Sequence, residues 1–362
     1  MLPFTKMSYS PKFLITNNIL RSIGSIEAAK AIIESSPLIP SWERQFQKEA
    51  VARTIHYSTH IEGNPLNFTE VKKIISGQEE DVVARERDIQ EIINYRKAME
   101  YIDEMARKEK EEGKSYYIGV DLIKGIHKIL SEKFLDSNRG GKYREHQATS
   151  RNSITKEITI VYPPADEIAA GVENFLDWLN SEEAQKNHPT LKSGIIHHEL
   201  VRIHPFDDLN GRAARVTSTL SLYLDGYDIK NFFSLEEHFD SDAENYYNAL
   251  KSIGEKDPDL TIWLEYFTEG LAIELHRVKD KVLKLSKDAK LKQAVGGQVY
   301  LSERQEIIVE RIQNFGSVSN KDFEKMFPNV SDDTILRELT DLKKKGAIKK
   351  EGSTKAARYV LG

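Results

Sequence analysis

The sequence predicts a mainly α-helical protein with a short β-hairpin near its centre and a separate domain at its C-terminus. Amphipathic segments with helical spacing recur through most of the 362 residues. One stretch, residues 154–164, instead alternates β-branched residues and ends in two prolines, as the arm of a hairpin does. Residues 276–299 are Lys-rich and contain a glycine pair, which is typical of a linker, and the segment after them has a different pattern.

The composition excludes several classes of protein. The 52 Lys and Arg residues against 57 Asp and Glu residues give a net charge of −5, which argues against a polycation that binds nucleic acid or anionic lipid. The absence of cysteine excludes a disulfide scaffold, a thiolate zinc site, an iron–sulfur cluster and a cysteine nucleophile. No apolar run approaches the roughly 18 residues that cross a bilayer, and the first residues make a poor secretory signal. We therefore expect a cytoplasmic protein with no membrane partner.

The predicted helices fall into two regions before the linker. An N-terminal helical region covers residues 1–115 and includes a helix over 43–62, which the Gly-Asn-Pro sequence after Glu62 ends. Charged amphipathic helices follow over 66–111. The core, residues 116–285, contains the hairpin arm and six predicted helices, over 120–133, 166–180, 190–203, 211–224, 240–253 and 259–285.

The linker is placed at residues 286–299 and the C-terminal domain at 300–362. Helices are expected over 302–313, 319–327 and 332–345, with a two-stranded wing over 349–361. This order resembles a winged helix-turn-helix domain. Its 12 Lys and Arg residues against 10 Asp and Glu residues give only +2, so both DNA contact and protein contact remain open.

The stretch with the most chemical information is residues 204–215, His-Pro-Phe-Asp-Asp-Leu-Asn-Gly-Arg-Ala-Ala-Arg. A helix should end at His204, because the residue before a proline is disfavoured in the α region. A second helix can begin with Asn210 as its N-cap. The loop between them would direct backbone N–H groups and a helix N-terminus at one point, which forms an anion site.

The side chains of this stretch complete a site for phosphate chemistry. Arg212 and Arg215 lie on one face of the second helix, where a bound polyanion would offset their unfavourable interaction with the helix dipole. Asp208 supplies a hard oxygen for Mg²⁺, and His204 is a base that acts near neutral pH. Together these groups predict phosphoryl or nucleotidyl transfer.

The stretch resembles the signature of Fic-domain proteins, His-Pro-Phe-x-Asp/Glu-Gly-Asn-Gly-Arg-x-x-Arg, and the resemblance spans about residues 40–285. It implies a Fic-type helical core and a protein adenylyltransferase, which transfers AMP from ATP to a hydroxyl side chain of a target protein or of itself. By position, His204 would deprotonate the hydroxyl and Asp208 would hold Mg²⁺. Phosphates of ATP would be bound by Asn210, Gly211 and Arg212.

Further roles follow from the same resemblance. Arg215 would reach the γ-phosphate, and Phe206 would anchor the loop. The hairpin would be the flap that docks the target by main-chain pairing, through Thr159, Ile160, Val161 and Tyr162. Arg144 and Gln147 precede this flap and are expected to orient it.

One position departs from the family pattern, because Leu209 stands where the family has glycine. If the loop needs a positive φ there, leucine costs on the order of 1–3 kcal/mol. A weakened or altered activity would then follow.

Residues 58–63 match the family's inhibitory pattern, Ser/Thr-x-x-x-Glu-Gly/Asn, with Ser58, Glu62 and Gly63 at its defined positions. Glu62 is expected in the last turn of its helix, where the dipole disfavours a carboxylate, and Arg215 has the opposite problem at a helix N-terminus. Pairing relieves both, and the resemblance implies that Glu62 then obstructs the γ-phosphate of ATP.

Two alternatives to this function differ from it in testable ways. The first is a DNA- or protein-binding regulator with a weakened Fic core, of which Leu209 would be the mark. The second is a Fic enzyme that transfers a different phosphate-containing group or removes AMP. The mass of the adduct distinguishes the second alternative, and salt-dependent duplex binding by residues 300–362 distinguishes the first.

Overall fold

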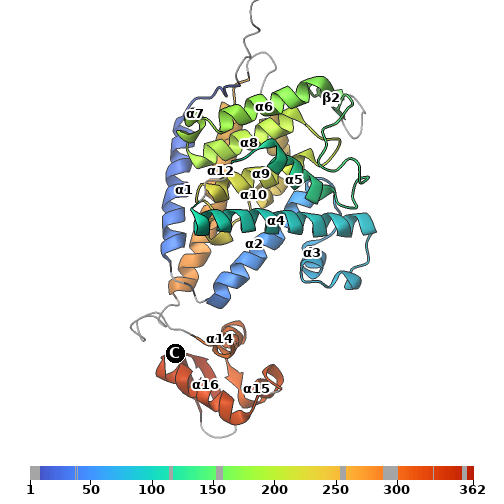
Figure 1. The fold of residues 1–362 in the computed structure, drawn as a ribbon. Coiled ribbons are helices and arrows are strands. Elements are labelled where there is room, and N and C mark those ends of the chain that lie inside the picture. Colours follow the sequence, from blue (N-terminus) through green and yellow to red (C-terminus); the bar gives the residue numbers. More distant parts are fainter. Residues whose placement is uncertain are drawn as a thin grey trace, which may run out of the picture. The chain divides into compact units, whose positions relative to one another are not determined.

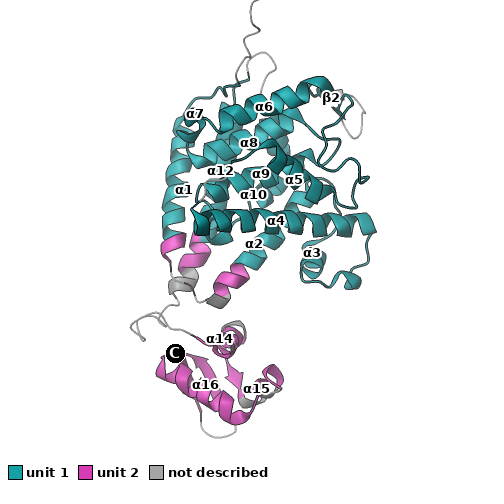
Figure 2. Cartoon of the chain, viewed as in Figure 1, with its two compact units in different colours: residues 1–32, 47–278 teal, residues 33–46, 279–362 magenta. Residues whose placement is uncertain are grey.

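The structure is a computed structural model that describes residues 9–36, 38, 40–113, 117–151, 158–252, 258–287, 301–328, 330–352 and 357–362. The chain forms two compact units, which Figure 2 shows in different colours. Residues 1–32 and 47–278 make the first unit, and residues 33–46 and 279–362 make the second. The predicted N-terminal region 1–115 and the predicted core 116–285 both contribute residues to the first unit.

Helices make up most of the chain before residue 288 (Figure 1). Those before the hairpin are α1 (Asn17–Ser35), α2 (Pro40–His60), α3 (Phe68–Ile75), η1 (Glu79–Asp81), α4 (Glu86–Glu112) and α5 (Val120–Ser131). Those between the hairpin and the motif loop are η2 (Ala165–Glu167), α6 (Ile168–Leu179), α7 (Glu182–Gln185) and α8 (Pro189–Ile203). Those after the loop are α9 (Asn210–Leu224), η3 (Ile229–Asn231), α10 (Leu235–Ser241), α11 (Ala243–Lys251) and α12 (Thr261–Lys287).

Helices α8 and α9 form the centre of the first unit, and they carry the motif between them. They pack against each other, while α9 also contacts α4 and α5 and α6 covers α8 (Figure 1). Most residues of both helices are buried, as expected for helices surrounded by others. Gly194 lets α12 approach α8 closely, because a Cβ there would lie 2.9 Å from Leu264 Cδ2. The Trp263 indole then donates a 2.7 Å hydrogen bond to the Gly194 carbonyl.

The hairpin consists of β1 (Thr149–Arg151) and β2 (Ile158–Val161), which pair antiparallel. Thr149 lies opposite Val161 and Ser150 opposite Ile160. The prediction of a hairpin arm over 154–164 is confirmed for residues 158–161, and residues 152–157 lie outside the described residues.

Several element boundaries differ from the sequence predictions. Helix α1 was not predicted. Helix α2 ends at His60, so Glu62 lies in the turn after the helix instead of in its last turn. Helix α9 begins at Asn210, and its N-cap position is Leu209. Helix α12 continues to Lys287, two residues into the predicted linker; the rest of that linker lies outside the described residues.

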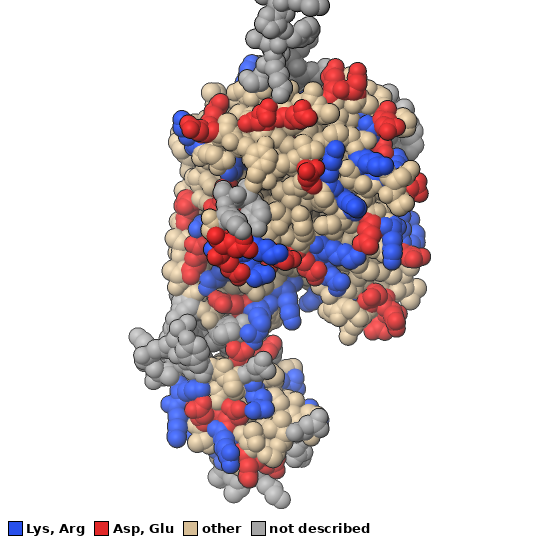
Figure 3. All heavy atoms as spheres, in the orientation of Figure 1, with Lys and Arg blue, Asp and Glu red and all other residues tan. Residues whose placement is uncertain are grey.

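The C-terminal residues form α14 (Glu303–Phe315), β3 (Val318–Ser319), α15 (Asn320–Met326), α16 (Asp332–Lys344), β4 (Ile348–Glu351) and β5 (Arg358–Leu361). The strands make an antiparallel sheet in the order β3-β5-β4. Apolar side chains of all three helices and the sheet share one core, including Ile308, Phe323, Leu339 and Tyr359. Ser302 and Gln305 cap α14 reciprocally, which fixes where this helix begins. On the face shown in Figure 3, basic and acidic side chains alternate over these elements.

Among the described residues, no helix combines the length and the apolar character needed to span a membrane.

Candidate active site

The loop between α8 and α9 begins at His204, whose φ of 50° places it in the left-handed region. Proline at 205 ends the helix here, as the sequence predicted. The His204 imidazole stacks on the Tyr162 ring, with ring centroids 3.7 Å apart. Its Nδ1 lies 3.3 Å from the Val201 carbonyl oxygen. Because a carbonyl only accepts, Nδ1 carries the proton and Nε2 keeps its lone pair for a substrate.

Burial lowers the pKa of His204 to about 4, and the neighbouring Arg144 acts in the same direction. Glu62 and Asp208 oppose this shift but do not reverse it. The imidazole is therefore neutral near pH 7, as a general base must be before it accepts a proton.

The Asn210 side chain closes the loop. Its Oδ1 accepts a 2.9 Å hydrogen bond from the Phe206 N–H, and its Nδ2 donates one of 2.9 Å to the Phe206 carbonyl. This corrects its predicted role as an N-cap, since the side chain bonds backward along the loop instead of to the first N–H groups of α9. Because both polar atoms of this side chain make hydrogen bonds within the loop, a phosphate would bind to the backbone of Asn210 and not to its side chain.

His127 on α5, which the sequence analysis missed, contacts the motif loop through its ring. Its ring stacks on Phe206 with centroids 3.8 Å apart. Its Nδ1 accepts a 2.9 Å hydrogen bond from the Gly141 N–H, so Nε2 carries the proton and donates to the Asp208 carbonyl at 3.2 Å. Burial lowers the pKa of His127 to about 4, which keeps this single neutral tautomer. Nothing in the sequence near residue 127 points to the motif 77 residues later.

Leu209 adopts a positive φ of 65°, the case in which the sequence predicted strain. Its side chain is 2% exposed, so burial offsets the strain. Compared with the glycine of the family pattern, leucine at this position adds backbone strain and also buries more apolar surface.

Substitutions at Leu209 should reveal both effects. Leu209→Ala is expected to lower the free energy of unfolding by about 2–4 kcal/mol, since it removes buried carbon atoms and keeps the strain. Leu209→Gly should be as stable as the alanine variant or up to about 1 kcal/mol more stable, because glycine accepts the left-handed region. Urea unfolding measures both values.

Leu200 on α8 provides the control, because it is also 2% exposed but lies in a regular helix. There glycine should be less stable than alanine by about 0.5–1 kcal/mol. If the glycine variant were also less stable than the alanine variant at position 209, the proposed backbone strain at Leu209 would be contradicted.

Asp208 is the half-exposed carboxylate of the motif loop. Its side chain is 43% exposed. Oδ1 accepts hydrogen bonds from the Leu209 N–H at 2.6 Å and from Arg212 at 3.2 Å. Oδ2 faces the guanidinium of Arg87, another residue that the sequence analysis missed, at 3.9 Å. The described residues contain no cluster of three or more His, Cys, Asp or Glu side chains for a metal, so an ion here would share Asp208 with substrate phosphates.

Arg212 is buried, with a side chain only 6% exposed. One terminal nitrogen pairs with Glu91 of α4 and the other with Asp208. Its Nε is buried and has no hydrogen-bond partner within the described residues. An unsatisfied buried donor costs about 1–3 kcal/mol, and a phosphate oxygen would satisfy it.

Arg215 lies deeper, with a side chain 2% exposed, and contacts two residues of the predicted inhibitory pattern. Its Nε donates to Ser58 Oγ at 2.6 Å and one terminal nitrogen donates to the Ser58 carbonyl at 2.9 Å. The same nitrogen lies 2.8 Å from Glu62 Oε1. Burial would lower the pKa of Arg215, but Glu62 and neighbouring tyrosines more than offset this and raise it. The guanidinium is thus fully charged and held by α2 and the turn after it.

The Glu62 carboxylate lies against Gly211 and Arg215, where the motif is expected to bind an anion. A Cβ added to Gly211 would collide with Glu62 Oε1, so a larger residue there would have to displace this carboxylate from its present position. Burial would raise the pKa of Glu62, yet Arg215 and Arg212 outweigh it and the pKa falls below its usual value. Gly63, at a φ of 91°, turns the chain sharply after Glu62. Asn64 then donates a 3.0 Å hydrogen bond to Glu91, which also holds Arg212.

The hairpin lies against the loop through Arg144, as the sequence predicted. This buried guanidinium donates to three carbonyls, those of His204 at 2.8 Å, His146 at 2.7 Å and Pro163 at 2.6 Å. Gln147 donates to the Tyr162 carbonyl at 2.6 Å. Of the four predicted docking residues, Val161 is exposed, Ile160 is half-buried and Tyr162 is buried under His204; the side chain of Thr159 lies outside the description.

We expect Arg144→Lys to release the hairpin from the loop, because an ammonium cannot reach three carbonyls in a plane. Each lost charged hydrogen bond corresponds to about 1.5–3 kcal/mol, or a tenfold change and more. Amide hydrogen exchange over residues 148–162 should therefore accelerate at least tenfold. Arg139→Lys is the matched control, since its exposed ion pair with Asp207 tolerates a lysine. Equal protection in both variants would exclude this role.

The geometry thus joins a neutral base, a half-exposed carboxylate, two buried arginines and a helix N-terminus around one loop. This combination could bind phosphate groups and accept a proton beside them.

Comparison with known proteins shows what this part of the chain is similar to. Residues 117–222 match the model of the Fic/DOC family, so the chain contains a Fic domain. Protein adenylyltransferase Fic of Drosophila willistoni is 26% identical over 253 residues, which cover 67% of this chain and 48% of that protein. The protein of the same name from Drosophila persimilis is 27% identical over 247 residues, with 66% and 45% covered. This chain therefore matches about half the length of these relatives.

Solved structures share the fold. A Fic family protein from Desulfovibrio desulfuricans G20 superimposes with a TM-score of 0.67 at 23% identity, over 98% of both chains. A Fic domain-containing signaling protein from Bacteroides thetaiotaomicron gives a TM-score of 0.60 at 22% identity, over 75% of this chain and 97% of that one. The prediction of a mainly helical Fic fold is confirmed.

Proposed function

We propose that this protein transfers AMP from ATP to a serine, threonine or tyrosine hydroxyl of a target protein in the cytoplasm, and that Glu62 inhibits the transfer. The observation that carries the proposal is the neutral His204, with Nε2 free, beside buried arginines at the N-terminus of α9. Kinship with protein adenylyltransferases at the family level supports AMP as the transferred group. A chain with no cysteine is compatible with a reducing compartment.

The proposed reaction breaks the bond between the α-phosphorus and its bridging oxygen. The target hydroxyl oxygen attacks the α-phosphorus, His204 Nε2 accepts the hydroxyl proton, and pyrophosphate leaves with the bonding electrons. Arg212 binds phosphate oxygens through its free Nε, and the N–H groups at the start of α9 bind others. Tyr162, stacked on His204, fixes the plane of the imidazole.

Magnesium fits this site as a partner of Asp208, because Oδ2 makes no hydrogen bond within the described residues and Mg²⁺ takes one or two carboxylates plus phosphates. The ion would neutralise charge on the phosphates. Arg87 stands 3.9 Å from the same oxygen and would add positive charge nearby.

Inhibition follows from the position of the Glu62 carboxylate. It pairs with Arg215 and covers Gly211, so an ATP phosphate would meet a negative charge where it needs a positive one. We propose that Glu62 must leave Arg215 before the γ-phosphate can bind there. A role of Glu62 in AMP removal is compatible with the same geometry, since the carboxylate lies beside the phosphate site.

The test is intact-mass measurement of wild-type protein and the Glu62→Gly variant after incubation with Mg-ATP and a mixture of candidate targets. The expected result is an adduct with the mass of AMP, on a target or on the protein itself, that is more abundant with the variant. An adduct of another mass would indicate a different transferred group. No adduct with either protein would support the regulator alternative.

The pH dependence of the active variant should report the state of His204. Because burial lowers its pKa to about 4, the base is unprotonated throughout the neutral range. The rate of Glu62→Gly is therefore expected to stay flat between about pH 5.5 and 8, whereas an unperturbed histidine would halve it near pH 6.5. Initial rates at saturating ATP measure this, and an inflection between pH 6 and 7 would contradict the assignment.

We further propose that residues 300–362 are a winged-helix domain that binds DNA or a protein. Three helices and a three-stranded antiparallel sheet around one apolar core support this. The last helix carries basic residues near its end, but Lys345 pairs with Asp341. Duplex binding that weakens steeply between 50 and 200 mM salt would indicate DNA, and no duplex binding at either salt concentration would exclude it.

A further inference from the structure

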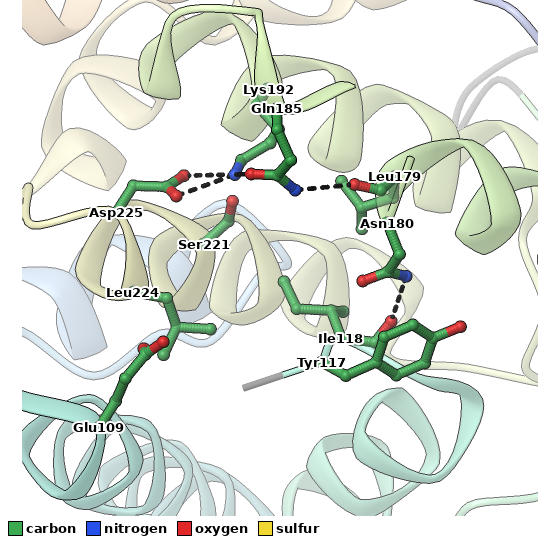
Figure 4. Close-up of a pocket in the computed structure, with 10 residues that line it drawn as sticks. All are labelled: Glu109, Tyr117, Ile118, Leu179, Asn180, Gln185, Lys192, Ser221, Leu224 and Asp225. Atoms are coloured by element: carbon green, nitrogen blue, oxygen red, sulfur yellow. Dashed lines mark hydrogen bonds and ion pairs between the residues drawn. The ribbon is translucent and has the colours of Figure 1, made fainter. Parts of the chain in front are cut away.

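A pocket lies in the first unit, away from the motif loop (Figure 4). It has a volume of about 430 Å³ and is formed where α4, α8 and α9 meet the segments that precede α5 and follow α6. Lys192 and Ser221 line it from the ends of α8 and α9 that are opposite the motif. At about 1.5 Å rise per residue, about 18 Å of helix separates Lys192 from His204, and about 15 Å separates Ser221 from Gly211. No motif residue lines this pocket.

One end of the pocket carries polar groups fixed in place. The Lys192 ammonium, with a side chain only 8% exposed, lies 2.8 Å from the Asp225 carboxylate and 3.2 Å from Gln185 Oε1. Gln185 is held in turn by the Leu179 carbonyl. Figure 4 shows these groups converging at the same end of the cavity. A buried ion pair is costly to build unless its geometry is fixed, and here three side chains fix it.

The Ser221 hydroxyl lies beside these groups and is unsatisfied. The residue is 1% exposed, and its Oγ has no hydrogen-bond partner within the described residues. A buried hydroxyl without a partner costs about 1–3 kcal/mol, so a ligand that bonds to it would gain correspondingly. Asn180 adds an acceptor: its amide nitrogen donates to the Ile118 and Leu176 carbonyls, and its Oδ1 projects into the cavity in Figure 4.

Aliphatic and aromatic side chains are interspersed with the polar groups of the lining. Ile118, Leu179 and Leu224 supply aliphatic parts of its walls, and the lining residue Tyr117 is 62% exposed. An exposed ring of this kind offers a face for a flat ligand. Pockets of about 300–1,000 Å³ with apolar walls and a few convergent polar groups are typical of small-molecule sites.

We propose that this pocket binds an uncharged nucleobase or nucleoside. Asp225 already neutralises Lys192, and Glu109 on the lining is acidic, so nothing here favours a phosphate. Ser221 and Lys192 offer polar groups at one end of the pocket and Asn180 offers a carbonyl oxygen farther along it, so the polar edge of a base can bond at either place. The Tyr117 ring and the aliphatic walls match its faces. The proposal is independent of AMP transfer, because it concerns equilibrium binding at a separate place.

Calorimetric titration of the full-length protein with adenosine, guanosine, cytidine and uridine tests this. We expect saturable binding of at least one nucleoside below 5 mM, with no gain from a 5′-phosphate. Ser221→Ala should reduce that affinity about fivefold or more without lowering the melting temperature, because the hydroxyl makes no hydrogen bond within the described residues. Tyr117→Ala, at an exposed position, should also reduce it, whereas His204→Asn should not.

Two outcomes would overturn the proposal. One is the absence of saturable binding by all four nucleosides. The other is binding that Ser221→Ala and Tyr117→Ala both leave intact, which would place the ligand elsewhere.

Discussion

Replacing His204 with asparagine in the Glu62→Gly background is expected to lower the rate of AMP transfer by a factor of about 10²–10⁴, the usual contribution of a general base. The reason lies in the hydrogen bonds of the ring, since Nδ1 is committed to Val201 and only Nε2 can take the proton of the target hydroxyl. Asparagine is chosen because His204 has a φ of 50°, a conformation that asparagine tolerates better than alanine. The rate is measured by incorporation of labelled AMP.

The control for this prediction is His146→Asn in the same background, because His146 is an exposed histidine near the hairpin. It should leave the rate within twofold. ATP affinity, measured separately by calorimetry, should change little in His204→Asn, since the imidazole contacts the hydroxyl and not the phosphates. A rate loss below tenfold would show that another group takes the proton.

Removing the Glu62 side chain should raise the rate of AMP transfer and lower stability at the same time. A charge-assisted hydrogen bond contributes about 1.5–3 kcal/mol, which corresponds to a tenfold to roughly 150-fold change in the fraction of protein with Arg215 released. Glu62→Gly is therefore expected to be at least tenfold faster. Its melting temperature should fall, because Arg215 then lies buried without its carboxylate partner and keeps the hydrogen bonds to Ser58.

Added Mg-ATP should recover part of this melting temperature in the variant, since phosphate replaces the carboxylate. Glu62→Gln should be intermediate, because it keeps the bulk over Gly211 and loses the charge. Glu79→Gly, at an exposed position, is the matched control and should change neither quantity. A variant that is destabilised but no faster would mean that Glu62 serves stability alone.

The pair of Glu62 and Arg215 persists across the neutral pH range. The pKa of Glu62 lies below its ordinary value, so the stability that the pair contributes is present above that ordinary value, near 4.5, and is lost only as the pH falls through the lowered one. Acidification within the neutral range is therefore no route to activation. A route that remains is a competing contact that draws the turn after α2 away.

The order of helices and the composition of the motif loop follow from local pattern, and the sequence predicted them. Proline at 205 ends α8, Gly63 allows the turn after α2, and the alternation of residues 158–161 gives a strand, because each depends on neighbours in the chain. The separate predictions for Ser58, Glu62 and Arg215 converge in the structure, where 153 residues of sequence separate the two charges that pair.

What the sequence by itself determined was therefore the fold class, the motif and the identity of its charged residues. The tertiary structure decided which atoms of these residues remain free. The Asn210 side chain makes its hydrogen bonds to the Phe206 backbone, and Arg212 Nε is left without a partner among the described residues. His127 and Arg144, from distant segments, donate hydrogen bonds to carbonyls of the loop. The tertiary structure also decided that Leu209 has a positive φ. The physical reason is that backbone pattern depends on residues a few positions apart, whereas hydrogen-bond satisfaction and burial depend on contacts between segments remote in the chain.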